Sequence, residues 1–177
     1  VLSGSRDFWV LTDGDRLPVA SSRQYVVGAA WENKSWLFDA ETYYKTLDGL
    51  TEYSLRFTPS GPGQFNYEEN FFNGTGTSRG IDLLLQKKYG RFNGWVGYTL
   101  SDTRQHYPVY GSEFYASNDV THEFKVTGLY HWRKWDFSAT WIYASGKPYT
   151  APEGGYQVTL LDGTTQDFLN VSAKNAY

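Results

Sequence analysis

The 177-residue chain contains no cysteine and no methionine, and it lacks the run of about 18 apolar residues that a membrane-spanning helix requires. Without cysteine, a disulfide scaffold and a thiolate metal site are both excluded. The formal net charge is −3, so we expect no nucleic-acid partner, which would need a basic stripe. The mean hydropathy of −0.54 excludes a helical membrane protein but not a β-barrel, whose inner face and loops are polar.

Apolar and polar residues alternate along six stretches of the chain. The clearest two cover residues 120–132 and 135–144, with only Arg133 and Lys134 between them. A period of two over this length indicates β-strands, because successive side chains point to opposite faces. Residues 25–31, 36–41, 81–89 and 95–100 show the same period, which gives three predicted hairpins with short turns at residues 33–34, 90–94 and 133–134.

Three long segments separate the hairpins, at residues 46–78, 104–118 and 146–176. They are rich in Gly, Ser, Thr, Asn and aromatic residues and show no sustained period. Long connections therefore fall at one end of the strands and short turns at the other, as in outer-membrane barrels. The predicted fold class is all-β: an antiparallel up-and-down meander that forms part of a transmembrane β-barrel.

The two predicted sheet faces differ in chemistry. The apolar face has aromatic residues beside the short turns, as an interfacial girdle would: Trp31, Trp36, Tyr89, Tyr130, Trp132 and Trp135. Charged residues take the opposite parity: Asp39, Glu41, Asp82, Glu123, Lys125 and Asp136. Lys87 is the main exception, close to a turn where its long side chain can reach the interface. A secreted β-sandwich also alternates in this way and is the alternative fold.

The ends of the chain suggest a part of something larger. The sequence begins at Val1 without an initiator Met or a signal peptide, and it stops at Tyr177 within a predicted loop. Six strands alone leave two unpaired edges, whereas a barrel in lipid must close. We therefore expect residues 1–177 to be a fragment of a larger barrel domain, without its closing strands.

Four runs of the sequence resemble the C-terminal barrel region of TonB-dependent outer-membrane receptors, particularly those of Bacteroidetes-like bacteria. The most specific are RGIDLLLQKKYGRFNGWVGYTLS at residues 79–101 and DVTHEFKVTGLYHWRKWDFSATWIYASGKPYTAP at 119–152. DFWVL at 7–11 and FDAETYYKTLDGLTEYS at 38–54 support them. Val120 and Thr121 depart from the pattern, because relatives often carry arginine after the residue matching Asp119.

The resemblance implies an outer-membrane location and active uptake. A ligand would bind the extracellular loops, and the TonB complex would act on an N-terminal plug domain inside the barrel. The implied partners are outer-membrane lipid, the protein's own plug domain, the TonB complex through the N-terminal region, and a small ligand of unknown identity. The plug domain and the TonB-contacting region are not among these residues, and no cofactor is implied.

The loop aromatics are the first candidates for ligand contact, because large rings lose little rotamer entropy and Tyr adds a hydrogen-bonding hydroxyl. They are Phe65, Tyr67, Phe71, Phe72, Tyr107, Tyr110, Phe114, Tyr115, Tyr149 and Tyr156. Packing of the loops against one another is the alternative role. The acidic residues of the same segments, which could meet cations or sugar hydroxyls or simply be solvated, are Glu68, Glu69, Glu113, Asp162 and Asp167.

The polar face should point into the barrel lumen. Its candidate residues, which could bind a plug, line a passage or form a cross-strand charge network, are Asp82, Glu123, Lys125 and Asp136. We predict no enzymatic activity. His106, His122 and His131 lack the spacing of a zinc site, and the Asp39–Glu41 pair, at the spacing of glycosidase carboxylates, is what any strand face provides. The secreted alternative would bind carbohydrate or a protein through the same aromatic loops.

Overall fold

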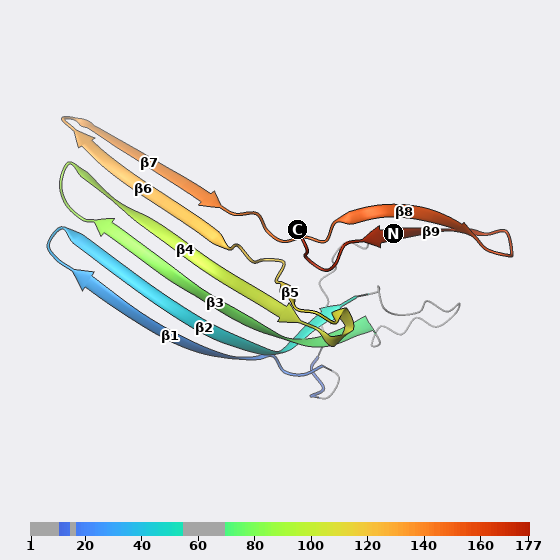
Figure 1. Cartoon of the computed structure of the whole chain (residues 1–177). Coiled ribbons are helices and arrows are strands. Elements are labelled where there is room, and N and C mark those ends of the chain that lie inside the picture. The colour runs from blue at the N-terminus through green and yellow to red at the C-terminus, as the bar shows by residue number, and fades with distance from the viewer. Residues whose placement is uncertain (1–10, 15–16, 55–69) are drawn as a thin grey trace.

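The computed structural model of the chain describes residues 11–14, 17–54 and 70–177 (Figure 1). The elements are β1 (Ser21–Glu32), β2 (Trp36–Tyr53), β3 (Phe71–Lys87), β4 (Phe92–His106), the 3-10 helix η2 (Pro108–Tyr110), β5 (Phe114–Tyr115), β6 (His122–Trp132), β7 (Trp135–Ala144), β8 (Pro152–Thr159) and β9 (Thr165–Val171). Within these residues, no helix has the length and apolar character needed to traverse a membrane.

Seven strands form one antiparallel sheet. Its order is β1-β2-β3-β4-β6-β7, with the short β5 paired to β4, so neighbours along the chain are neighbours in space. The sheet is open, with β1 and β7 at its two edges. Figure 1 shows long curved strands whose tight turns gather at one end, while the separate β8–β9 hairpin lies beyond the other end. The predicted all-β antiparallel meander is confirmed.

The tight turns occupy residues 33–35, 88–91 and 133–134. In the first, the backbone N–H of Asn33 donates to the carbonyl of Trp36 at 2.9 Å. The Asn33 Oδ1 in turn accepts from the backbone N–H groups of Ser35 and Trp36, each at 2.8 Å. This side-chain mimicry of a backbone turn is a reason why Asn favours such positions. The second turn ends earlier than predicted, because β4 begins at Phe92.

The strands are longer than the sequence pattern indicated, and the predicted loop at residues 46–78 was too long. β2 continues to Tyr53 and β3 begins at Phe71, with a bulge between Leu47 and Leu50. Gly49 has a φ of +71° there, a conformation that glycine adopts at little cost. The bulge offsets Leu47 from Leu50 by three positions, and Phe71 and Phe72 take opposite parities, so the backbone pairs without a period of two to reveal it.

The other two predicted loops also contain structure. β4 extends to His106, and η2 and β5 follow within residues 107–118. The segment predicted as a loop at residues 146–176 contains the β8–β9 hairpin. Gly154 and Gly155 interrupt the alternation in β8, where the register with β9 shifts between Pro152 and Gly154. Glycines in a strand obscure the period on which a sequence prediction depends.

The strand register places the predicted apolar residues on one common face. One row across the sheet, one residue from each long strand, comprises Ala29, Ala40, Leu83, Tyr98, Phe124 and Tyr143. The next row on the opposite face comprises Gly28, Glu41, Asp82, Thr99, Glu123 and Ala144. The sheet therefore has one apolar and one polar face, as the alternation predicted.

The buried apolar residues do not lie under the sheet. Among the described residues, the apolar side chains that are fully buried are Tyr107, Phe114 and Ala116, all in the segment between β4 and β6. The large side chains of the apolar face are exposed instead, with Trp141 at 59% and Phe137 at 52%. The core of the described structure is thus a small cluster at the loop end of the strands.

Candidate functional site

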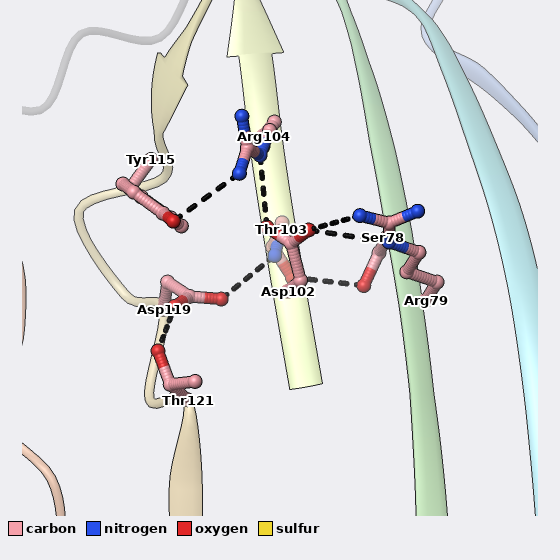
Figure 2. Close-up of polar contacts among 8 residues, drawn as sticks. All are labelled: Ser78, Arg79, Asp102, Thr103, Arg104, Tyr115, Asp119 and Thr121. Atoms are coloured by element: carbon pink, nitrogen blue, oxygen red, sulfur yellow. Dashed lines mark hydrogen bonds and ion pairs between the residues drawn. The ribbon is translucent and has the colours of Figure 1, made fainter. Parts of the chain in front are cut away.

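A charged network marks the loop end of β3 and β4 (Figure 2). The Asp102 carboxylate accepts from Arg79 Nη2 at 2.8 Å and Nε at 3.2 Å, and from Arg104 Nε at 3.0 Å. Arg104 Nη2 also donates to the Tyr115 hydroxyl at 3.2 Å, and its guanidinium lies over the Tyr115 ring at 4.8 Å. These contacts hold β5 against the end of β4.

Asp119 fixes the return of the chain into β6. Its buried carboxylate accepts from the Thr103 backbone N–H at 2.7 Å and from the Thr121 hydroxyl at 3.3 Å. The Asp119 N–H donates to the carbonyl of Ala116 at 2.9 Å, which closes a tight turn. The segment between β4 and β6 is thus tied to the sheet at its base, as Figure 2 shows.

Three of the predicted ligand-contact aromatics form a cluster in this segment. The rings of Tyr107 and Phe114 stack at 6.0 Å between centroids, and the Tyr110 ring meets Phe114 edge-on at 5.2 Å. Tyr107 packs directly on Gly74 of β3, where an added Cβ would lie 2.7 Å from the Tyr107 ring carbon Cγ. A glycine is required there because the ring occupies the space of a side chain.

Glu52 at the end of β2 joins this cluster to the C-terminal segment. Its Oε1 accepts from the Tyr110 hydroxyl at 2.7 Å and from Lys174 Nζ. Lys174 Nζ also donates to the Tyr110 hydroxyl at 3.3 Å and lies 5.0 Å from the centre of the Tyr110 ring. Burial raises the pKa of Tyr107 to about 12, with the charge of Glu52 adding to the shift. Burial and the hydrogen bond to Glu52 raise the pKa of Tyr110.

Asn175 holds the C-terminal segment in place. Its buried side-chain amide donates to the carbonyl of Tyr115 at 2.6 Å and to the hydroxyl of Ser117 at 3.1 Å. Its backbone N–H donates to the Thr150 hydroxyl at 3.0 Å. The segment after β9 therefore lies against the segment between β4 and β6.

A pocket of about 390 Å³ lies between these two segments. Its walls include Tyr110, Glu113, Phe114, Tyr115, Lys174 and Asn175. The aromatic rings provide apolar surface, and a small number of polar groups converge on the same space, which is the usual character of a small-molecule site. We take this loop pocket, between residues 109–115 and 173–176, as the candidate functional site.

The structure brings only some of the predicted ligand-contact residues to the loop pocket. Tyr107, Tyr110, Phe114 and Tyr115 form or support it, and Glu113 lines it. The others lie apart: Phe71 packs edge-on against Tyr53 at 5.2 Å, Phe72 pairs with Glu52 in the β2–β3 ladder, Tyr149 is next to Tyr177, and Tyr156 stacks on Phe168 in the β8–β9 hairpin. Phe65, Tyr67, Glu68 and Glu69 lie outside the described residues.

Two acidic candidates belong to the β8–β9 hairpin instead of the pocket. Asp162 accepts from the backbone N–H of Thr164 at 2.9 Å and from its hydroxyl at 2.7 Å, in the turn between β8 and β9. Asp167 lies in β9, opposite Gln157 of β8. Asp162 therefore has a local role in shaping a turn.

Sequence reasoning missed Glu52, Lys174 and Asn175. Glu52 and Lys174 are 122 residues apart and meet only because β2 runs far beyond its predicted end. Each is a single polar residue with no patterned partner nearby in the sequence, so the sequence offered no signal for their contact.

The four predicted lumen residues lie on the same polar face and have local partners. Asp82 accepts from the Thr99 hydroxyl at 2.5 Å, and Lys125 Nζ donates to Glu123 at 2.8 Å. Asp136 and the His131 ring nitrogen Nδ1 are 2.5 Å apart. These contacts fit a network that stiffens the sheet, while a role in lining a passage stays a prediction.

Comparison with known proteins provides no further assignment, because no family model, no curated protein and no solved structure matches the chain.

Proposed function

We propose that this sheet is part of the wall of an outer-membrane receptor that binds a ligand at extracellular loops and imports it with energy from TonB. The observation that carries the proposal is the continuous, exposed apolar face across β1, β2, β3, β4, β6 and β7. Exposed apolar surface of this extent marks an interaction with another apolar phase. Because the apolar face spans every long strand, lipid is the apolar phase that would cover all of it.

The dimensions and margins of this face support the membrane interpretation. Phe124 and Trp132 of β6 are eight residues apart, about 27 Å along a strand and about 21 Å of membrane thickness at a tilt of about 40°. This is close to the apolar band of about 25 Å in outer-membrane barrels. Trp31, Trp36 and Trp135 border the face at the tight turns.

The opposite margin of the face is charged. Arg79 and Asp102 occupy the same parity as Ile81 and Leu100, one row further towards the loops. Their ion pair ends the apolar band on the side where the loop pocket lies. With short turns in the periplasm and longer connections outside, the pocket would be extracellular.

The secreted β-sandwich has less support. A sandwich covers the apolar face of one sheet with a second sheet. In the part of the chain that the structure describes, the second sheet is the two-stranded β8–β9 hairpin, and Figure 1 shows it beyond the end of the strands, not over their face. Import energised by TonB rests on the resemblance of residues 79–101 and 119–152 to TonB-dependent receptors.

Charge on each face tests the proposal. Val126 lies in the middle of the apolar face of β6, and its neighbour Thr127 lies on the polar face. When the complete barrel protein that contains this sheet is exported in a Gram-negative host, Val126→Arg should reduce its recovery in the outer membrane, because arginine near the midplane costs about 2–4 kcal/mol. Thr127→Arg, the matched control, should be recovered there like the unsubstituted chain.

Recovery of the unsubstituted chain as a folded, water-soluble protein would contradict the proposal and favour the sandwich. Equal loss of both arginine variants from the membrane would also contradict it, because the two faces would then not differ in their surroundings.

A further inference from the structure

We propose that the tight-turn end of the sheet binds anionic phospholipid headgroups of the phosphatidylglycerol type. The surface consists of six basic residues, which we call the basic rim: Lys34, Lys87, Lys88, Arg91, Arg133 and Lys134. Figure 1 shows that the turns that carry them gather at one end of the strands. The inference rests on the proposed function, because a sheet that lies in lipid brings this end to a membrane surface.

Charge is distributed unevenly along the strands. The whole chain has 16 lysines and arginines against 19 aspartates and glutamates. The three tight turns and the strand ends beside them, at residues 32–36, 87–92 and 131–136, contain the six cations of the basic rim and two acids, Glu32 and Asp136. A chain that is acidic as a whole is therefore basic at this end, which would attract an anionic surface.

The two acids of this end are engaged on the polar face, where the strand register places both of them. Glu32 accepts from Lys88 Nζ, and Asp136 Oδ1 lies 2.5 Å from the His131 ring nitrogen Nδ1. In the described part of the chain, no acidic side chain forms an ion pair with the other five cations of the basic rim. These five charges are therefore available to an anion from outside the sheet.

Lys87 is the member of the basic rim that the register places on the apolar face. It pairs with Trp36 of β2 and with Gly94 of β4, and its Nζ lies 5.7 Å from the centre of the Trp36 ring. Its stem extends towards the turn, where a Cβ added at Gly90 would be 3.9 Å from Lys87 Cε. A lysine that crosses apolar surface and ends beside an interfacial tryptophan is placed to reach a lipid headgroup.

Arg133 repeats this arrangement at the turn between β6 and β7. Its guanidinium carbon lies 5.5 Å from the centre of the Trp132 ring, which is on the apolar face and 49% exposed. A guanidinium presents its donors in a planar fork that matches two phosphate oxygens, whereas an ammonium acts as a point charge. At both turns, a cation is thus held beside a tryptophan at the margin of the apolar face, the level of the lipid phosphates.

A headgroup with a net negative charge suits the basic rim better than a zwitterionic one. Phosphatidylcholine carries an ammonium group beside its phosphate, and the unpaired cations of the rim would repel that group. Phosphatidylglycerol has the same phosphate without the cation. A basic residue near an anionic membrane surface contributes about 1 kcal/mol, which is about a factor of five in affinity.

Quenching of Trp36 by brominated lipid measures this preference beside Lys87. The complete barrel protein that contains this sheet keeps Trp36, carries Phe at its other tryptophans, and is reconstituted in vesicles of dibrominated phosphatidylcholine. Unlabelled lipid that gathers around Trp36 displaces the brominated lipid and restores the fluorescence. We expect phosphatidylglycerol to be about fivefold more effective than unlabelled phosphatidylcholine. The difference should shrink at high salt, which screens the charges.

Lys87→Gln identifies the group responsible. Removing its charge should reduce the preference for phosphatidylglycerol about fivefold. Lys45→Gln is the matched control, because it makes the same change on β2, the strand of Trp36, but at a position of the polar face, opposite Ser78 of β3. Both lysines are half-buried, and the control should keep the preference of the unsubstituted protein.

Equal effects of the two headgroups on Trp36, or equal losses of preference in the two variants, would overturn the inference and leave the proposed membrane location intact. Stronger relief of quenching by lipid A than by phosphatidylglycerol would also overturn it, because the turn end would then belong to the outer leaflet. If brominated lipid does not quench Trp36 at all, the sheet does not lie in lipid, and the proposed function fails together with the inference.

Discussion

At the scale of single residues, the loop end of the sheet is organised around Tyr107. Its ring is 4% exposed and lies on Gly74, and it contacts the buried Phe114 ring and the half-buried Tyr110 ring. Glu52 lies close enough to raise the pKa of both tyrosines. The cluster is therefore apolar in its packing but sensitive to the charge of one carboxylate.

The raised pKa of Tyr107 predicts a specific response to alkali. The folded state keeps the Tyr107 proton up to about pH 12, whereas an unfolded tyrosine loses it near pH 10. Below pH 10, Tyr107 makes its full contribution to the free energy of unfolding. This contribution falls as the pH rises towards 12, because the unfolded state then binds fewer protons than the folded state. Tyr107→Phe should therefore reduce the loss of stability over this interval.

Absorbance at the tyrosinate band provides the measurement for Tyr107. The chain has fifteen tyrosines, and Tyr107→Phe should remove one equivalent from the most alkaline part of the titration. Tyr156→Phe, which also removes one tyrosine but from the exposed β8–β9 hairpin, is the matched control. If both variants lost the same part of the curve, Tyr107 would not be protected in the folded chain.

Residue types predicted part of the candidate site. Tyr110, Phe114 and Glu113 were candidates because aromatic and acidic side chains in a loop are good ligand contacts, and the structure places all three around one pocket. Lys174 could not be predicted, since its partner Glu52 is distant in sequence and its role depends on the tertiary path of the C-terminal segment. The chemical character of a loop can be inferred from its residue types, but contacts between residues that are distant in sequence cannot.

At the scale of elements, the pairing of β4 with β6 depends on Gly94. It lies opposite Gly128 with a φ of +155°, and an added Cβ would be 2.1 Å from the carbonyl oxygen of Thr127. The backbone of β6 cannot move away from Gly94 without breaking its own pairing with β7. Gly94→Ala should therefore cost about 3 kcal/mol in the free energy of unfolding.

Urea unfolding in lipid vesicles, followed by tryptophan fluorescence, measures the effect at Gly94. Gly154→Ala in β8 is the matched control, because no atom lies within 4 Å of its added Cβ. The control should stay within about 0.5 kcal/mol of the unsubstituted chain. A Gly94→Ala chain as stable as the control would show that β4 and β6 do not approach so closely there.

Strand positions could be predicted where one face is apolar, and strand ends could not. In β6 and β7 the alternation runs the full length, and the predicted residues 135–144 match β7. In β2 and β3 the alternation ends near Thr42 and Ile81, although pairing continues to Tyr53 and Phe71. Beyond the apolar band, the bulge between Leu47 and Leu50 and the adjacent Phe71 and Phe72 interrupt the alternation, so the period disappears while the strand pairing persists.

At the scale of the whole molecule, the two faces of the sheet define what surrounds the protein. The register combines six separate alternations into one apolar surface, and no single strand could show that these surfaces are continuous. The face to which each residue of a strand points was predictable from the sequence. The alignment of one strand with its neighbours depends on the turns that connect them. The tight turns at residues 33–35 and 133–134 place Trp31, Trp36, Trp132 and Trp135 at the same end of the strands (Figure 1).

Tryptophans on both faces allow a direct test of these surroundings. Trp141 of β7 pairs with Val126 in the middle of the apolar face, Trp132 pairs with Trp135 at the turn, and Trp95 pairs with Thr127 on the polar face. In chains that keep one of these tryptophans and carry Phe at the others, lipids brominated deep in the acyl chain should quench Trp141 strongly. Lipids brominated near the headgroup should quench Trp132 more, because it lies at the margin of the apolar band.

Trp95 is the internal control, because it is an equally large ring in the same sheet but faces away from the proposed lipid. Its fluorescence should respond little to either brominated lipid, while iodide in water should reach it from the polar side. Equal quenching of Trp95 and Trp141 by lipid would contradict the assignment of the faces. If the chain does not bind the vesicles and iodide does not quench Trp141, the apolar face is covered by protein. That is the arrangement a β-sandwich requires.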